Sequence, residues 1–354
     1  MNRRVLDLIV TNVLAVVLGL VVSGLLILLL GKDPLHAYGT LISGVFRDQY
    51  TFGEIFVKAT PLIFSGLAFA LPFKAKLFNI GAQGQFYIGA VTAVAVSLWL
   101  GPLIPGPLVL LIALALTLVL SAVWAGLIGL AKAKRGSNEF LLSMMSTFVA
   151  LALMNYLLRT FLREAKGEYP QTDPLSNATW LPVIVPDTRI HLGFVLALLA
   201  AIGCWFFLFR TKLGFRVRAT GQNARAARMS GINPDRVYVL IFAVAGALAG
   251  AAGFTEVNGV QHMLVQGFNP DVGAQGIGIA ILANANPIGV IFSSILFGVL
   301  IVGGGIMGQL SGIPNSYINV MIGIVMIFVI VGNFVRARIE TRREVRRVKA
   351  GDSK

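Results

Sequence analysis

Three carboxamide side chains lie between apolar runs in the stretch Asn79-Ile-Gly-Ala-Gln83-Gly-Gln85. A carboxamide donates and accepts hydrogen bonds without carrying charge, which suits it to contact a neutral polar solute. Lipid offers such groups no partners, so at membrane depth they are found against another helix or facing a cavity. A second Gly-Ala-Gln-Gly occurs at residues 273–276. We expect the two copies to mark the pathway of a solute.

The composition indicates a membrane protein. Mean hydropathy is +0.82, and 56% of the 354 residues are hydrophobic while only 12% are charged, which excludes an ordinary soluble domain. Apolar runs of about twenty residues, long enough to cross about 30 Å of hydrocarbon as helices, recur along the whole chain. We therefore predict an all-α fold with a single transmembrane domain over residues 1–354 and about ten transmembrane helices.

The first of these helices is expected to be uncleaved, because its apolar run is too long for the core of a signal peptide. Polar loops are expected at 31–50 and 163–189. The ten expected helices cover residues 5–30, 55–73, 79–100, 108–130, 139–159, 191–209, 237–256, 273–286, 288–306 and 317–335.

Basic residues gather on one side of this predicted topology. Of the 29 Lys and Arg residues, 22 lie at the N-terminus, in alternate loops and in the tail, including seven in 210–236 and eight in 336–354. The positive-inside rule then places both termini in the cytoplasm, with 210–236 as a cytoplasmic loop and 336–354 as a basic cytoplasmic tail. The net charge of +14 is accounted for by these loops and does not indicate binding to nucleic acid.

The sequence offers little for catalysis. The single cysteine, Cys204, lies in an apolar run, so no disulfide framework is expected. The three histidines are too scattered for a metal site, and we expect no cofactor. No Ser/His/Asp set falls at one depth, which argues against an intramembrane enzyme. The glycine-rich segment 24–32 has the wrong spacing for a phosphate-binding loop.

The two Gly-Ala-Gln-Gly copies suggest an inverted repeat. The first opens a helix that runs from inside to outside, and the second opens one that runs from outside to inside. Helices 2–5 would then correspond to helices 7–10, an arrangement common in transporters. The alternative is chance recurrence of small residues in a chain with 39 glycines.

The basic segment 210–236 predicts a short surface helix. Asn223 can cap its start and Gly231 can end it. One interpretation is a basic loop held at lipid headgroups. The other is a docking helix for a partner protein, since Gly221 and the pair Ala226-Ala227 allow close approach.

These motifs resemble those of a known family. Gly221-x-Asn223-x-x-Ala226-Ala-x-x-x-Gly231-Ile resembles the coupling loop of ATP-binding-cassette importer permeases of the branched-chain amino acid and simple-sugar type. Asn79-Ile-Gly-Ala-Gln-Gly-Gln85 resembles the signature of the nucleoside and simple-sugar branch, where Glu often stands in place of Gln83. Asp33-Pro34-Leu35, Asn138-Glu139 and Asn286-Pro287-Ile-Gly289 resemble further family segments.

The resemblance implies a permease subunit of an importer in the plasma (inner) membrane of a bacterium. Its partners would be ATPase subunits, a second and related permease chain, an extracytoplasmic solute-binding protein and the lipid bilayer. The solute would be a nucleoside or a related sugar-containing molecule. The resemblance assigns coupling to the ATPase to Gly221, Asn223, Arg225, Ala226, Ala227 and Gly231.

The pathway of a neutral solute should be lined by uncharged hydrogen-bonding groups. Helical spacing puts Asn79, Gln83 and Phe86 on one face and Gln85 on another, so some of these groups must bond neighbouring helices instead. The candidates are Asn79, Gln83, Gln85, Tyr87, Thr147, Asn155, Gln275, Asn284 and Asn286.

The main alternative is an ion-coupled secondary transporter, which usually needs carboxylates within the membrane. The expected helix interiors are nearly free of acids. We expect Glu139 to form a structural ion pair with the basic residues 132–135, and Glu256, near a helix end, to face water.

Overall fold

The computed structural model describes residues 3–269, 271–314 and 316–351. Within these ranges the regular structure is helical, and the extended residues form only two isolated bridges. Eight of the described helices are long and apolar enough to cross a membrane. The prediction of an all-α membrane protein is therefore confirmed. The chain divides into two units, one of Asp48–Gly298 and one of Met1–Arg47 with Val299–Lys354.

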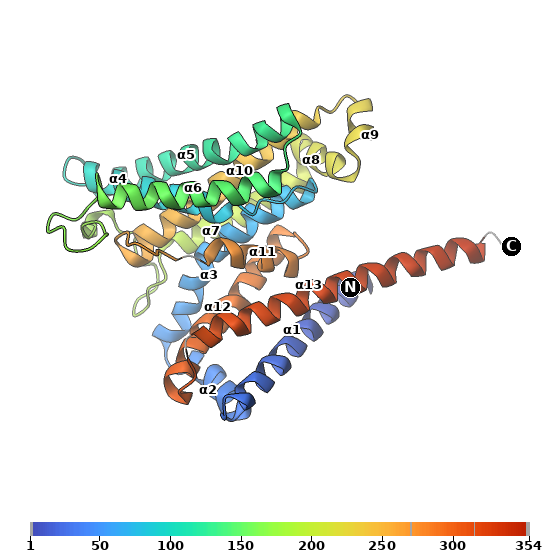
Figure 1. The fold of residues 1–354 in the computed structure, drawn as a ribbon, viewed down its shortest axis with the longest axis horizontal. Helices are drawn as coiled ribbons and strands as arrows, with labels where there is room; N and C mark the ends of the chain where they lie inside the picture. The colour runs from blue at the N-terminus through green and yellow to red at the C-terminus, as the bar shows by residue number, and fades with distance from the viewer. Residues whose placement is uncertain (1–2, 270, 315, 352–354) are drawn as a thin grey trace. The chain divides into compact units, whose positions relative to one another are not determined.

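The larger unit holds the two motif-bearing helices and the basic segment (Figure 1). It also contains the beginning of α12 (Pro287–Ser311), which continues into the smaller unit. Its other helices are α3 (Gln49–Lys74), α4 (Ala82–Leu100), α5 (Gly106–Arg135), α6 (Glu139–Arg159), the 3₁₀ turn η1 (Asn177–Thr179), α7 (Leu192–Arg210), α8 (Lys212–Gln222), α9 (Ala224–Met229), α10 (Pro234–Glu256), the π-helix η2 (Val257–Gln261) and α11 (Val272–Leu282).

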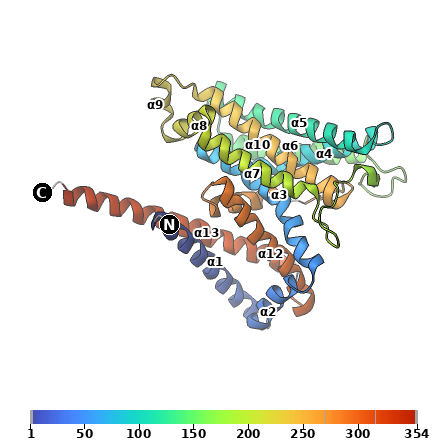
Figure 2. The same cartoon turned by 180° about the vertical axis from the view of Figure 1, so that it is seen from behind.

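Two helices, α3 and α10, form the centre of this unit. Most of α3 is buried, and it packs against α10, α11 and α7. Helix α10 packs against α5, α4 and α3. Figures 1 and 2 show α5 and α10 side by side, with α8 and α9 at one end of the unit and the long loop after α6 at the other. The centre is thus made by helices whose small residues permit close contact.

The contact between α4 and α10 is a backbone contact. A Cβ atom added to Gly89 would lie 2.4 Å from the carbonyl oxygen of Gly250, and one added to Gly250 would lie 2.3 Å from Oγ of Ser121 on α5. Membrane helices pack by such small residues, because lipid provides no hydrophobic drive for association. These close contacts therefore fix the positions of α4, α5 and α10 along one another.

The start of α6 agrees with the sequence prediction, whereas the predicted end of the preceding helix at residue 130 is wrong, because α5 continues to Arg135. Helix α5 ends at Gly136, whose φ of 63° suits glycine. Asn138 caps α6 by accepting from the amide of Phe140 at 3.0 Å. Lys132 and Glu139 form an ion pair with a separation of 2.9 Å, which confirms the expected structural role of Glu139.

The smaller unit contains α1 (Arg3–Leu29), α2 (Pro34–Val45), the remainder of α12 and α13 (Ser316–Gly351). The hydroxyl of Tyr317 donates to the carbonyl of Ser23, which ties α13 to α1. The prediction of a polar loop at 31–50 is wrong, because α2 forms there. Asp33 caps α2 by accepting from the amide of Leu35, and proline stands at the first helical position, where it is favoured.

Two predicted boundaries near the motifs are also wrong. The predicted helix 237–256 does not end in a loop, because α10 continues into the π-helix Val257–Gln261. The predicted helix 273–286 ends early, since α11 stops at Leu282. Neither α11 nor α4 is among the eight spans. The last residues of the basic tail, 352–354, lie outside the described residues.

The Gly89 contact can be tested by overpacking it. Gly89→Val should lower the free energy of unfolding by about 1–3 kcal/mol, because its side chain must displace the α10 backbone. The measurement is the thermal unfolding midpoint of the purified protein in detergent. Gly203→Val is the matched control, since a Cβ at Gly203 on α7 meets nothing within 4 Å. Equal midpoints for the two variants would contradict the account.

Candidate functional site

The connection from α3 to α4 turns back along α3 before α4 begins. The Asn79 amide donates to the carbonyl of Ala68, within the last two turns of α3, at 3.3 Å. Asn79 and Gln85 exchange two hydrogen bonds through their carboxamides, at 2.9 and 2.8 Å. Both side chains are fully buried. Asn79 precedes the helix, so the expectation that it shares a helical face with Gln83 is wrong; with Gln85 it fixes the start of α4.

Gln83 joins the starts of the two motif-bearing helices. Its Nε2 donates to the carbonyl of Asn269 at 2.9 Å, and its Oε1 accepts from the backbone N–H of Gly273 in the first turn of α11. A Cβ on Gly273 would lie 2.5 Å from the backbone nitrogen of Gln83. The two Gly-Ala-Gln-Gly segments, far apart in sequence, therefore meet at the N-terminal ends of α4 and α11.

This meeting of helix ends has a defined electrostatic character. The first turn of a helix presents unpaired N–H groups and the positive end of the helix dipole. The Gln83 carboxamide satisfies one such N–H with a neutral oxygen, so the contact contains no ion pair that would have to be broken. The Tyr87 hydroxyl also interacts with Gln83. The arrangement can exchange its hydrogen bonds for those of an uncharged polar molecule.

Glu256 is a site residue that the sequence analysis misplaced. Its side chain is buried, with 1% of the residue exposed, so the expectation of a water-facing carboxylate is wrong. Its Oε1 accepts from Gln261 Nε2 at 3.3 Å and from the Asn269 side chain. Asn269 therefore links Glu256 to Gln83. The sequence did contain a signal for the burial of Glu256, because it places an acid at the end of an apolar run. A carboxylate next to a membrane segment needs hydrogen-bonding partners.

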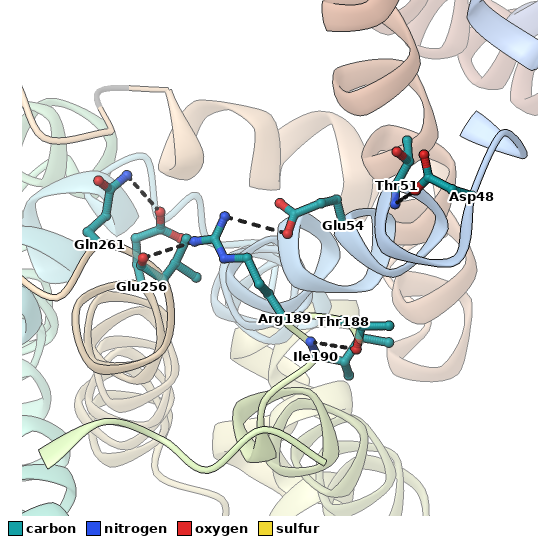
Figure 3. A network of polar contacts seen from close by, with 9 residues as sticks. Asp48, Thr51, Glu54, Thr188, Arg189, Ile190, Glu256 and Gln261 are labelled. Atoms are coloured by element: carbon teal, nitrogen blue, oxygen red, sulfur yellow. Dashed lines mark hydrogen bonds and ion pairs between the residues drawn. The ribbon is translucent and has the colours of Figure 1, made fainter. Parts of the chain in front are cut away.

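An arginine ties the long loop after α6 to α3 and to the π-helix η2. Arg189 pairs with Glu54 on α3 at 3.5 Å and donates to the carbonyl of Val260 at 3.0 Å. Figure 3 shows its side chain between Glu54 on one side and Gln261 with Glu256 on the other. The loop that carries Arg189 thereby braces the α10 end on which Glu256 stands.

Two histidines lie beside this brace. The His262 ring stacks on Trp180 with 3.8 Å between ring centroids, and His191 Nδ1 accepts from the amide of Gly193 as the N-cap of α7. Burial, the neighbouring His262 and Arg189 together lower the pKa of His191 to about 4. Burial and Arg189 also lower the pKa of His262. Both imidazoles are therefore neutral at pH 7.

The other predicted pathway residues do not gather around Gln83. Thr147 bonds within α6, to the carbonyl of Ser143 at 3.3 Å, although its backbone packs on Gly84 of the first motif. Asn155 is part-buried on α6, and its Oδ1 has no hydrogen-bond partner in the described part of the chain. Gln275 is half-buried on α11.

Asn284 and Asn286 lie at the far end of α11, in the turn before α12. The Asn284 carbonyl accepts from Lys74 Nζ at 3.1 Å. The Asn286 side chain accepts from the amide of Ile288 at 3.1 Å, in the first turn of α12. Of the nine candidates, Gln83 and Tyr87 contact each other at the meeting point of the motifs, and Gln275 stands in the second motif itself, in the first turn of α11.

Within the basic segment the short helix forms as the sequence predicts, whereas α8, which precedes it, was not predicted. Helix α9 begins after Asn223, whose side chain accepts from the amides of Arg225 and Ala226 at 3.0 and 3.1 Å. It is followed by Gly231, which adopts a φ of 80°. Gly221 and Ala227 are buried, whereas Arg225 and Ala226 are exposed.

A groove lies between α8 and α9. Its volume is about 710 Å³. Ala226 and Ile232 contribute apolar walls, and Arg216 and Lys212 contribute charge.

The buried His191 predicts a pH dependence of stability. Its pKa is lower in the folded chain than in the unfolded one, so its contribution is full above pH 6.5 and is lost as pH falls toward 4. The free energy of unfolding should fall by about 2 kcal/mol between pH 7 and pH 5. The check is the thermal midpoint against pH. His191→Asn keeps an N-cap acceptor and should flatten the curve; an unchanged slope would contradict the assignment.

Comparison with known proteins gives a consistent result. The family model described as branched-chain amino acid transport system / permease component matches residues 51–330. The glucose ABC transporter permease protein TsgB13 of Haloferax volcanii is 35% identical, over 92% of this chain and 87% of that protein. The guanosine ABC transporter permease protein NupP of Bacillus subtilis is 33% identical, over 89% and 91%.

A further relative is the nucleoside ABC transporter permease protein NupB of Lactococcus lactis, 27% identical over 96% of both chains. No solved structure matches the chain. The family match covers both Gly-Ala-Gln-Gly segments and the segment that holds α8 and α9. The chain belongs to the branched-chain amino acid transport system / permease component family, and it is a multi-pass membrane permease subunit of an ATP-binding-cassette importer rather than an enzyme.

Proposed function

We propose that this permease carries a nucleoside or a related sugar-containing solute, and that the solute passes the meeting point of α4 and α11. The observation that carries the proposal is the uncharged contact of Gln83 with Gly273 and Asn269. A neutral, hydroxyl-rich solute can replace those hydrogen bonds one for one and is released without breaking an ion pair. The relatives named for guanosine, nucleosides and glucose support this solute class.

The proposed topology has ten crossings with both termini in the cytoplasm. It adds α4 and α11 to the eight long apolar helices. Helix α11 has 11 residues and is about 17 Å long, roughly half of the hydrocarbon thickness. Broken helices of this kind hold the substrate sites of transporters built from inverted repeats. We include in the proposal the correspondence of α3–α6 with α10–α13, supported by the motif that opens the second helix of each set.

The proposed partners follow from the surface formed by α8 and α9. An ATPase subunit would place an element in the groove of about 710 Å³, against Ala226. A second, related permease chain would complete the pathway, and a solute-binding protein would deliver the solute from the opposite side. The bacterial plasma membrane is the proposed location. Basic residues in 210–236 would also meet the anionic inner leaflet.

The function is tested by reconstitution of the permease with its ATPase and second permease in proteoliposomes, with the solute-binding protein supplied outside. Uptake of labelled nucleosides and sugars should require ATP inside and should stop when hydrolysis is blocked. The alternative is an ion-coupled carrier, which would use a buried carboxylate such as Glu256. Uptake driven by a proton or sodium gradient without ATP would support that alternative and overturn the proposal.

Replacement of Gln83 should affect transport specifically. Gln83→Leu removes the carboxamide that exchanges partners with the solute, and uptake should fall at least about tenfold, equivalent to about 1.4 kcal/mol. The folded amount of the complex, measured by size exclusion, should remain near that of the native chain. Gln85→Leu is the contrasting variant, because it breaks the Asn79–Gln85 pair and should lower the folded amount instead. Unchanged uptake in Gln83→Leu would contradict the pathway.

The docking surface is tested by a charge at its centre. Ala226→Arg places a bulky cation in the groove and should release the ATPase, with loss of uptake and a folded permease. Co-purification of the ATPase is the measurement. Ser137→Arg adds the same charge in the turn between α5 and α6 and should retain the ATPase. Retention by Ala226→Arg would show that the groove is not the docking site.

A further inference from the structure

Both ends of α11 are held by side chains of neighbouring helices in the larger unit. At the first end, Gln83 of α4 accepts from Gly273. At the other end, the ammonium of Lys74, the last residue of α3, donates to the backbone carbonyl of Asn284 at 3.1 Å. The helix has only 11 residues and is about 17 Å long, so we expect a displacement at one end to reach the other.

Lys74 also touches the basic segment. A Cβ atom on Gly221 of α8 would lie 2.1 Å from the carbonyl oxygen of Lys74 and 2.9 Å from Cα of Ala75. The backbone of α8 therefore rests directly on the end of α3. The backbone of Lys74 meets α8, while its side chain meets the turn after α11. One residue thus connects the surface formed by α8 and α9 to the helix that contacts Gln83.

The turn that Lys74 holds has an unfavourable backbone conformation. Asn284 and Ala285 are consecutive residues with φ of 52° and 50°. Asparagine tolerates the left-handed region, whereas alanine is disfavoured there. The turn is closed by a hydrogen bond from the Ala285 amide to the Ala280 carbonyl at 2.7 Å. Strained turns of this kind occur at switch regions, where neighbouring contacts maintain them.

We propose that Lys74 is a positioning residue that transmits movement of the docking segment to α11. Displacement of α8 moves the end of α3, and the Lys74–Asn284 bond carries the turn and α11 with it. The first turn of α11 then leaves Gln83, which frees its carboxamide for the solute. This inference rests on the proposed function, because it takes α8 and α9 as the surface on which the ATPase acts.

The experiment compares three variants of the full permease in the reconstituted complex. Lys74→Met keeps the length of the side chain and removes the ammonium. It should lower uptake at least tenfold while ATP hydrolysis stays within twofold, so that more ATP is spent for each solute molecule. Lys74→Arg retains a donor and should restore most of the uptake. Lys76→Met is the matched control, since Lys76 is exposed in the same connection and should leave uptake unchanged.

Native coupling in Lys74→Met would overturn the inference, as would an equal loss in Lys76→Met. A second measurement keeps Lys74 in place and so does not depend on the folding of that variant. Spin labels at Asn286→Cys, which is exposed beside the turn, and at Leu103→Cys, which is exposed before α5, report the position of the turn. A non-hydrolysable ATP analogue should change the distance between them, and an unchanged distance would overturn the inference.

Different outcomes distinguish the proposed function from the role of Lys74. If the native complex shows no ATP-dependent uptake, the proposed function fails. If the native complex transports and hydrolyses ATP, but Lys74→Met transports with native stoichiometry, only the role of Lys74 fails.

Discussion

A helix that begins inside a membrane leaves backbone N–H groups without partners. In the topology that we propose, α4 and α11 both begin there, and their first turns meet through the carboxamide of Gln83. Gly273 permits the approach because any side chain there would collide with the Gln83 backbone. A neutral polar contact is thereby enclosed by apolar helices, at the place where we propose that the solute passes.

Three sets of neighbouring contacts support the Gln83 contact. Asn79 and Gln85 fix the start of α4 by their mutual hydrogen bonds. Glu256 holds Asn269, and the Arg189–Glu54 pair braces the end of α10. The Asn79–Gln85 pair and the network around Glu256 leave Gln83 as the carboxamide that joins the two motifs. Two of the three carboxamides of the first motif, Asn79 and Gln85, thus bond to each other and hold the start of α4.

Much of this arrangement was predictable from sequence, and the exceptions have physical causes. Apolar length alone located helices such as 139–159, and cap residues located α9. Helix α2 was missed because the polar residues around it favoured a loop, although Asp33 is a clear N-cap residue. The turn after α11 is held by Lys74, 210 positions away in sequence. Glu256 is bonded to Asn269, which Gln83 contacts from 186 positions away. Periodicity does not encode such contacts. Pattern matching likewise could not separate Gln83 from Asn79.

The central claim is that the Gln83 contact closes the pathway and must separate during transport. Its most direct test joins the two sides covalently, with Gln83→Cys and Asn269→Cys in a Cys204→Ser background and a short, reducible bifunctional thiol reagent. The double variant lacks the carboxamide of Gln83 and should keep only the residual uptake expected for Gln83→Leu. The reagent should link the two positions and stop that residual ATP-driven uptake, and reduction should restore it. A fully cross-linked chain that still transports at the rate of the unlinked double variant would contradict the proposed role of the contact.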